Sequence, residues 1–158
     1  MSVRYWPLEL HTLFAVLEDL RDWDRREIFA TLEEQDPFDL AEKIVFLPGV
    51  QGAVFSSQGA PVAAAGATPL WPGVAGVWAF GTDRFPEVGL AATRYVRRVL
   101  TPNLLAAGFH RAECKSMEGH EEAHRWLEAC GLHREATHPK YGRNGETFHT
   151  YAFVRGDD

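Results

Sequence analysis

The strongest constraint on the fold is a long central stretch without charge. No Asp, Glu, Lys, Arg or His occurs between Leu47 and Thr82. A stretch of this length is long enough to span a bilayer. It also contains many glycines and four prolines, namely Pro48, Pro61, Pro69 and Pro72. Because proline interrupts helical hydrogen bonding and a spanning segment must satisfy its own backbone, we expect short buried strands joined by tight turns, and no membrane span.

Runs of small and β-branched residues divide this stretch into three expected strands, at residues 52–56, 61–67 and 73–80. Gln58-Gly59 and residues 69–73 are typical of the turns between them. Both flanks show apolar residues near helical spacing. They predict a strand at 3–6, helices at 8–20, 22–32 and 37–45, a helix at 86–100 broken or kinked by Thr101-Pro102 and closed by 104–108, a strand at 110–116, a helix at 120–130, and strands at 132–137 and 147–154.

Details of these flanks fix some boundaries. Asp22 or Asp24 is expected to cap the second helix. Gly131 is a suitable left-handed stop after the helix at 120–130, and Asn144-Gly145 indicates a turn between the last two strands. The expected order is one strand, three helices, three strands, a helix, a strand, a helix and two strands, which is an α/β fold.

Length and charge restrict the function. A chain of 158 residues is expected to form one domain over residues 1–158. Its net charge of −6 argues against a nucleic-acid-coating protein, which needs basic surface. The two cysteines, Cys114 and Cys130, are too few for a disulfide framework. The start has no secretory signal pattern, so we expect a location in a cytoplasm or in an assembly built there.

The segment His120-Glu121-Glu122-Ala123-His124 matches the pattern H-E-x-x-H. On a helix, the two histidines can ligate zinc while the first glutamate acts as general base, as in a small zinc hydrolase. The alternative is an exposed polar first turn, favoured by the helix dipole. No third ligand follows at a family spacing, and charged residues crowd the motif, so we expect no metal here.

The residues around this helix resemble the Gcn5-related N-acetyltransferase (GNAT) family. Its signature reads Asn-x-x-Ala-x-x-aromatic-Tyr-x-x-x-Gly-Phe, and Ala123, Trp126 and Gly131 match it, with Leu132 at the last position. The order of strands and helices is also similar over nearly the whole chain. The resemblance implies a GNAT-like, mostly antiparallel mixed sheet of about six or seven strands flanked by helices.

Further residues are similar to the phage branch of this fold, which includes the internal virion protein A of short-tailed coliphages. They are Asp24-Arg25-Arg26-Glu27-Ile28, Trp78-x-x-x-Thr82, Arg125-Trp126-Leu127-Glu128-x-x-Gly131 and the Gly142-Arg143-Asn144-Gly145 hairpin. This resemblance implies a viral protein of a bacteriophage, located in the host cytoplasm or the virion.

The family resemblance also implies acetyl-CoA as cofactor and places it. The strand at 77–82 would splay from its neighbour and face the pantetheine, and residues 83–91 would form the loop that holds the pyrophosphate at a helix N-terminus. Gly89-x-Ala91 matches the end of the family's phosphate-loop pattern. The implied cofactor-binding residues are Trp78, Phe80, Thr82, Arg84, Val88, Gly89, Leu90 and Ala91.

The chain departs from the family at three positions. Pro86 stands where the family has Gln or Arg, Leu127 where it has the Tyr that often acts as general acid, and His120 where it has Asn. Glu87 also adds a negative charge to the phosphate loop, which Arg84 can offset. Replacement acids or bases are Tyr141, His124 and Glu118, with Tyr151 a further candidate.

These observations leave two main functions and a third. The first is an acetyl-CoA-dependent N-acyltransferase, a transferase with a degenerate site that acts on an amine or protein acceptor. The second is a non-catalytic virion or assembly component that kept the fold and contacts virion proteins. The third is the zinc hydrolase described above.

Overall fold

The computed structural model describes residues 2–156. The elements follow the expected order. They are β1 (Val3–Pro7), α1 (Leu10–Leu17), α2 (Asp22–Phe29), α3 (Pro37–Val45), β2 (Gln51–Ser57), β3 (Ala60–Trp71), β4 (Val74–Gly81), the 3-10 turn η1 (Phe85–Glu87), α4 (Gly89–Tyr95), the π-helical turn η2 (Val96–Leu100), α5 (Thr101–Ala106), β5 (Arg111–Met117), α6 (Glu121–Ala129), β6 (His133–His138) and β7 (Phe148–Val154).

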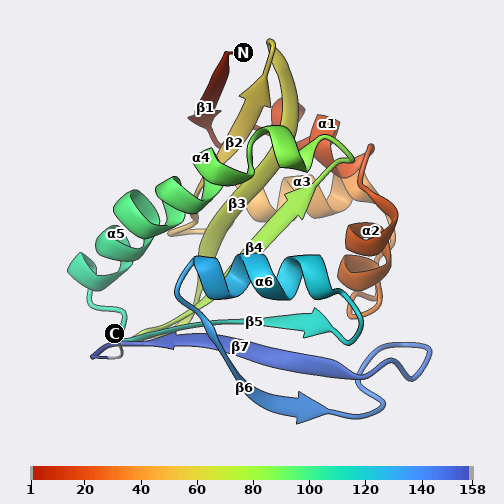
Figure 1. Cartoon of the computed structure of the whole chain (residues 1–158), viewed down its shortest axis with the longest axis vertical. Coiled ribbons are helices and arrows are strands. Elements are labelled where there is room, and N and C mark those ends of the chain that lie inside the picture. The colour runs from red at the N-terminus through yellow and green to blue at the C-terminus, as the bar shows by residue number, and fades with distance from the viewer. Residues whose placement is uncertain (1, 157–158) are drawn as a thin grey trace.

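The seven strands form one sheet with the order β1-β2-β3-β4-β5-β7-β6. All neighbours are antiparallel except β4 and β5, which run parallel. Helices α4, α5 and α6 cover one face, called the front face below, and α1, α2 and α3 lie on the other, the back face (Figure 1). This is the α/β architecture that the sequence predicted, and the uncharged stretch forms β2, β3 and β4. No helix within residues 2–156 is long and apolar enough to cross a membrane.

Strand β3 is built from small residues, and this lets its neighbours on both faces come close. Ala63, Ala65 and Ala67 belong to the front core, and Ala64 to the back core. Gly66 pairs with Trp78 across the β3–β4 ladder. A Cβ at Gly66 would lie 2.4 Å from Cζ2 of Trp78, which no real packing allows. Glycine is therefore required for the indole to lie over the strand.

The helix on the front face passes through Pro102 where a break or kink was expected. Helical residues run without interruption from Gly89 to Ala106, and the turn before the proline is π-helical. Proline has no N–H to donate and its ring crowds the preceding turn. The wider π turn accommodates that loss inside one helix, as π-bulges do.

The start of α2 also differs from expectation. Arg21 is the N-cap residue and the helix begins at Asp22. Asp24 does not cap the helix, because its side chain is buried and accepts a hydrogen bond of 2.7 Å from the backbone N–H of Gly81. This bond connects α2 to the end of β4, and it places a carboxylate inside the molecule.

Candidate functional site

The parallel strands β4 and β5 pair over only three residues each. Val74, Ala75 and Gly76 lie opposite Arg111, Ala112 and Glu113, and the pairing then stops. Strand β5 continues along β7 to Met117, and β4 continues along β3 to Gly81. The two strands therefore diverge, as the family resemblance implied.

The divergence leaves part of the β4 backbone open. The N–H and C=O of Gly81 are bound by Asp24 and by the N–H of Arg21, on the side away from β3. Because main-chain groups alternate between the two sides of a strand, those of Val77 and Ala79 face the same side. Beyond Gly76, β4 has no strand partner there within residues 2–156.

A cavity of about 530 Å³ occupies this opening and extends to both faces of the sheet. Its front part is lined by the α4–α5 helix and α6, including Val96, Leu100, Trp126 and Leu127. Its back part lies between the sheet and helices α2 and α3. The lining is mainly apolar, and Arg21, Asp24, Glu27 and His120 form a polar group within it.

That polar group is a carboxylate–imidazole–carboxylate cluster in which Asp24 and His120 are buried and Glu27 is partly buried. His120 is 3% exposed; its Nδ1 atom contacts Oε2 of Glu27, and its Nε2 atom lies 3.4 Å from Oδ1 of Asp24. The Ser116 hydroxyl donates to the same Glu27 oxygen at 3.3 Å, and Nε of Arg21 donates to Oδ1 of Asp24 at 2.9 Å. Both ring nitrogens of His120 thus face a carboxylate. Such an arrangement can accept and hold a proton.

Local sequence explains the position of this imidazole. Gly119 has a φ of +93°, which lets the chain turn sharply between β5 and α6. His120 follows it, and its ring stacks on the indole of Trp23 with centroids 5.2 Å apart and planes 11° apart. Helix α2 supplies Trp23, Asp24 and Glu27 together, so one helix both supports the ring and provides its two carboxylates.

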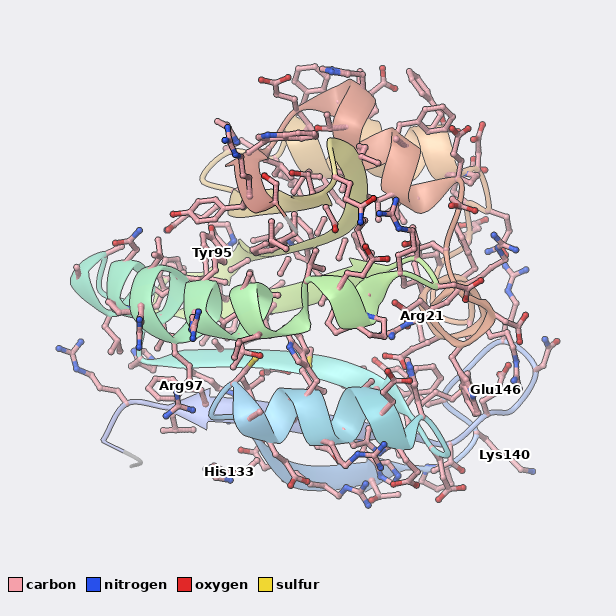
Figure 2. The ribbon with its side chains drawn as sticks, turned by 45° about the horizontal axis from the view of Figure 1, so that its top comes forward. Arg21, Tyr95, Arg97, His133, Lys140 and Glu146 are labelled. Carbon is pink, nitrogen blue, oxygen red and sulfur yellow. The ribbon has the colours of Figure 1, made fainter. Side chains whose placement is uncertain are left out.

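Burial and charge act in opposite directions on Asp24. Desolvation raises the pKa of its carboxyl above the ordinary value, while Arg21, His120 and the Gly81 N–H lower it. Burial is the largest of these effects, so the pKa is raised overall. Arg21 lies beside the start of α4 (Figure 2), where its guanidinium also sits 4.6 Å from the ring centroid of Phe85.

The N-terminus of α4 lies at the open end of β4. The first backbone bond of this helix runs from the N–H of Ala92 to the carbonyl of Val88. The N–H groups of Gly89, Leu90 and Ala91 therefore have no backbone acceptor within residues 2–156. Such free N–H groups, together with the helix dipole, favour an anion.

The acidic residue of this loop is already paired. Both carboxylate oxygens of Glu87 accept hydrogen bonds from Arg84, at 2.8 and 3.0 Å, and one also accepts from Ser57. These bonds lower the pKa of Glu87 to about 2. Arg84 thus offsets the charge of Glu87, and its guanidinium is already engaged in these hydrogen bonds.

The eight predicted cofactor residues lie in four places in the structure. Trp78 and Phe80 line the cavity from the back face, where they stack on each other with centroids 5.1 Å apart. Thr82 is buried and donates to the carbonyl of Val62, which fixes the turn after β4. Gly89, Leu90 and Ala91 begin α4, and Val88 and Arg84 belong to the preceding turn.

The predicted acids and bases lie elsewhere. Tyr141 is 45% exposed and Glu118 is also exposed; neither lines the cavity. His124 is buried on α6, with Nε2 3.1 Å from the carbonyl oxygen of Met117 and the ring stacked on Tyr151. Burial, aided by Arg134, lowers the pKa of His124.

The H-E-x-x-H pattern does not bring its two histidines to one site. His120 faces Glu27 and Asp24, whereas His124 contacts Met117 and Tyr151. In the described part of the chain, no group of three or more His, Cys, Asp or Glu residues is arranged to hold a metal ion.

Asp24 and Glu27 are the functional candidates that sequence reasoning missed. A usable signal was present, because both acids lie on the same side of α2 as the apolar Ile28, at spacings of three and four residues. Carboxylates on the buried side of an amphipathic helix are seldom there for solubility.

Comparison with solved structures identifies the fold. The chain superimposes on yncA from Salmonella typhimurium with its cofactor acetyl-CoA (TM-score 0.74, 12% identity, 100% of this chain and 96% of that chain). It also superimposes on a GNAT superfamily phosphinothricin acetyltransferase from Sinorhizobium meliloti in complex with AcCoA (0.74, 13%, 99% and 90%), and on AAC(6')-Ib in complex with ribostamycin and coenzyme A (0.67, 18%, 98% and 94%).

These identities are low, so the likeness concerns the fold, which is that of the GNAT acetyltransferases. No protein-family model matches the sequence, and no curated protein matches it either.

Proposed function

We propose that the protein is an N-acyltransferase that uses acetyl-CoA. The observation that carries the proposal is the cavity at the opening between β4 and β5, which is lined by Val77 and Ala79 of β4, by Phe85 of the turn before α4 and by the Asp24–His120–Glu27 cluster. Solved structures of this fold that hold acetyl-CoA or coenzyme A support the choice of cofactor.

The residues of the opening fit such a cofactor. The open main-chain groups of Val77 and Ala79 suit the amide groups of pantetheine, which can pair like an additional strand. The N–H groups of Gly89, Leu90 and Ala91 suit the pyrophosphate. At Gly89 a Cβ would lie 3.3 Å from Cε1 of Phe85, so a larger residue there would crowd the loop.

When bound, acetyl-CoA would supply the acyl thioester, whose carbonyl carbon would form a bond to the acceptor nitrogen while its C–S bond would break and the leaving thiolate would take up a proton. The chain's part is to receive the proton that the amine loses. Glu27 and His120 are assigned this role because they share one hydrogen-bonded contact inside the cavity. Asp24 and Ser116 position them through contacts to the ring and to Glu27.

The site is degenerate relative to the family pattern, and the cluster compensates for part of this. Leu127 is buried in the front core and cannot donate a proton. Pro86 contributes neither an N–H nor a polar side chain to the phosphate loop. His120 provides an ionisable group on the β5–α6 connection instead of the family's Asn.

The alternative is a non-catalytic component of a phage virion that kept the fold. It rests on the sequence resemblance, as do a phage origin, virion partners and a location in the host cytoplasm or virion. One titration separates the two functions, because a ligand that binds the native state raises its melting temperature.

The test is a thermal-shift titration of the purified chain with acetyl-CoA. We expect the melting temperature to rise with ligand concentration, and the Gly89→Glu variant to lose that rise. Asn103→Glu adds the same charge on the exposed surface of α5 and serves as the matched control. No shift at saturating acetyl-CoA in the wild-type protein would contradict the proposal and favour the virion component.

A further inference from the structure

The cavity continues on the back face beyond the opening between β4 and β5. There it runs between the sheet and helices α2 and α3, away from the start of α4. The walls of this part, called the back groove below, are apolar side chains. They are Ile28, Leu32, Leu40, Ile44, Leu47 and Leu70.

An aromatic ring forms part of the floor of the back groove. Trp78 lies on Gly66 of β3 and stacks on Phe80. Beside it, Gly76 has no side chain, and a Cβ there would meet only the flexible end of Leu70, at 3.3 Å. Flat aromatic surface next to a leucine side chain that covers the glycine suits an apolar ligand group that packs by contact area.

The two exposed leucines of the groove indicate an opening to solvent. Leu47 is 41% exposed and Leu70 is 48% exposed. Both belong to the groove walls, so apolar surface continues from its interior to its edge. Contiguous apolar surface that reaches solvent is a known feature of ligand-binding grooves.

Charge is concentrated at one end of the back groove. Asp24, Glu27 and His120 lie at the β4–β5 opening. The other carboxylate that borders the cavity, Glu113, is already bound by Arg111 at 2.8 Å and by Lys115 at 3.2 Å. Asp24 is likewise bound by Arg21, His120 and the Gly81 N–H, whereas Glu27 has only His120 and Ser116 as partners among the described residues. The groove therefore offers Glu27 as the carboxylate for one ammonium group at its inner end, and its remaining length offers apolar contact.

Resting on the proposed acyltransferase function, we infer that the acceptor is a small monoamine with an apolar tail. Its nitrogen lies at the Glu27 and Asp24 end, where the thioester would meet it, and its alkyl or aryl tail lies over Trp78 toward Leu47. A polyamine or an aminoglycoside would place further ammonium groups against leucine and isoleucine side chains, which burial without partners makes costly.

Direct binding of amines to the chain, without cofactor, tests this inference by isothermal titration calorimetry. The ligands are butylamine, hexylamine, phenethylamine, hexan-1-ol and spermidine. We expect the affinity to rise about fourfold for each added methylene, as apolar burial predicts. Hexylamine should bind at least about tenfold more tightly than hexan-1-ol, because a hydrogen-bonded charge at a buried carboxylate contributes that much.

Two neighbouring variants locate the tail. Leu47→Glu places a charge in the groove wall, and Phe46→Glu places the same charge on the adjacent, 70% exposed side chain, which does not line the cavity. We expect hexylamine affinity to fall about tenfold or more in Leu47→Glu, since the tail would lie against a charge, and to stay within about twofold in Phe46→Glu.

Tighter binding of spermidine than of hexylamine, or equal loss in both variants, would overturn the inference. Because no cofactor is present, failure here is distinct from failure of the proposed function. A protein that binds acetyl-CoA but prefers spermidine remains an acyltransferase with a different acceptor, whereas one that binds hexylamine and ignores acetyl-CoA is not this enzyme.

Discussion

The carboxylate of Asp24 and the backbone N–H of Gly81 are joined by a hydrogen bond of 2.7 Å between Oδ2 and N. The bond holds helix α2 against the end of β4, at the point where β4 has left β5. It replaces part of the ladder that the divergence of the strands removes, and it fixes the carboxylate beside His120.

Asp24→Asn should remove the contribution of this carboxyl group to the pH dependence of the free energy of unfolding. Burial raises the pKa of Asp24 above 3.8, so the native protein binds this proton more tightly than the unfolded chain. The resulting stabilisation is complete below pH 3.8 and is lost as the pH rises through the native pKa, by about 1.4 kcal/mol for each unit of difference.

Urea denaturation of both proteins between pH 3 and 7 measures this effect. The wild-type free energy of unfolding, relative to that of Asp24→Asn, should fall across the window that begins at pH 3.8. A difference that stays constant with pH would contradict the raised pKa.

Glu27→Gln should lower kcat by about a hundredfold or more, the usual contribution of a positioned general base. Its amide keeps the shape of the side chain but cannot take a proton. Glu128→Gln changes an exposed glutamate on α6 and should leave kcat unchanged. Release of coenzyme A with hexylamine as acceptor gives the rate, and equal activity of Glu27→Gln and wild type would exclude Glu27 as the base.

His124 should make the fold sensitive to mild acid. Burial lowers its pKa below 6.5, so the native state binds this proton less tightly than the unfolded chain. Stability from this residue is present above pH 6.5 and is lost as the pH falls through the lower native pKa. His124→Gln should weaken this loss, measured as melting temperature between pH 5 and 8, whereas His133→Gln, at an exposed position, should reproduce the wild-type slope.

Gly66→Ala should destabilise the protein by about 1–3 kcal/mol, the cost of overpacking a core. The added methyl would meet both Trp78 and the carbonyl oxygen of Gln51 at 2.4 Å. Gly76→Ala is the matched change on the next strand, where only the flexible end of Leu70 lies within 3.3 Å. Denaturant titration should show a clearly larger loss for Gly66→Ala, and equal losses would mean that the indole moves aside at little cost.

The cysteines should resist thiol reagents in the native state. Burial raises the pKa of both Cys114 and Cys130 to about 12. At pH 8 their thiolate fraction is then about a thousandfold below that of an ordinary cysteine. Ellman's reagent should report almost no reaction until denaturant is added, and rapid labelling of the folded protein would contradict this.

Element order and the interruption of the central stretch were predictable from sequence, because they depend on local pattern. The uncharged segment forms three strands since its prolines and glycines exclude a long helix, and the Gln58-Gly59 turn has positive φ at both residues. Helix continuity through Pro102 was not predictable in the same way. It depends on a π turn that accommodates the missing N–H and the ring of Pro102, and sequence pattern alone does not reveal such a turn.

The backbone path of the candidate site was predicted, whereas most of its side chains were not. The divergence of β4 and β5 was implied by the family resemblance. The Asp24–His120–Glu27 cluster joins two segments about a hundred residues apart, and no local pattern encodes that meeting. Tyr141 and Glu118 were candidates by chemistry, and only the tertiary structure shows that they do not line the cavity.

The exposed edge of β4 at Val77 and Ala79 consists of atoms that all amino acids share. Selection for such an edge constrains the path of the chain and leaves the identity of its residues free. Mutation can therefore replace most residues of the chain while the path of β4 that leaves these main-chain groups open is kept. A backbone path preserved in this way is compatible with 12–18% identity, the values at which the chain superimposes on acetyltransferases along almost its entire length.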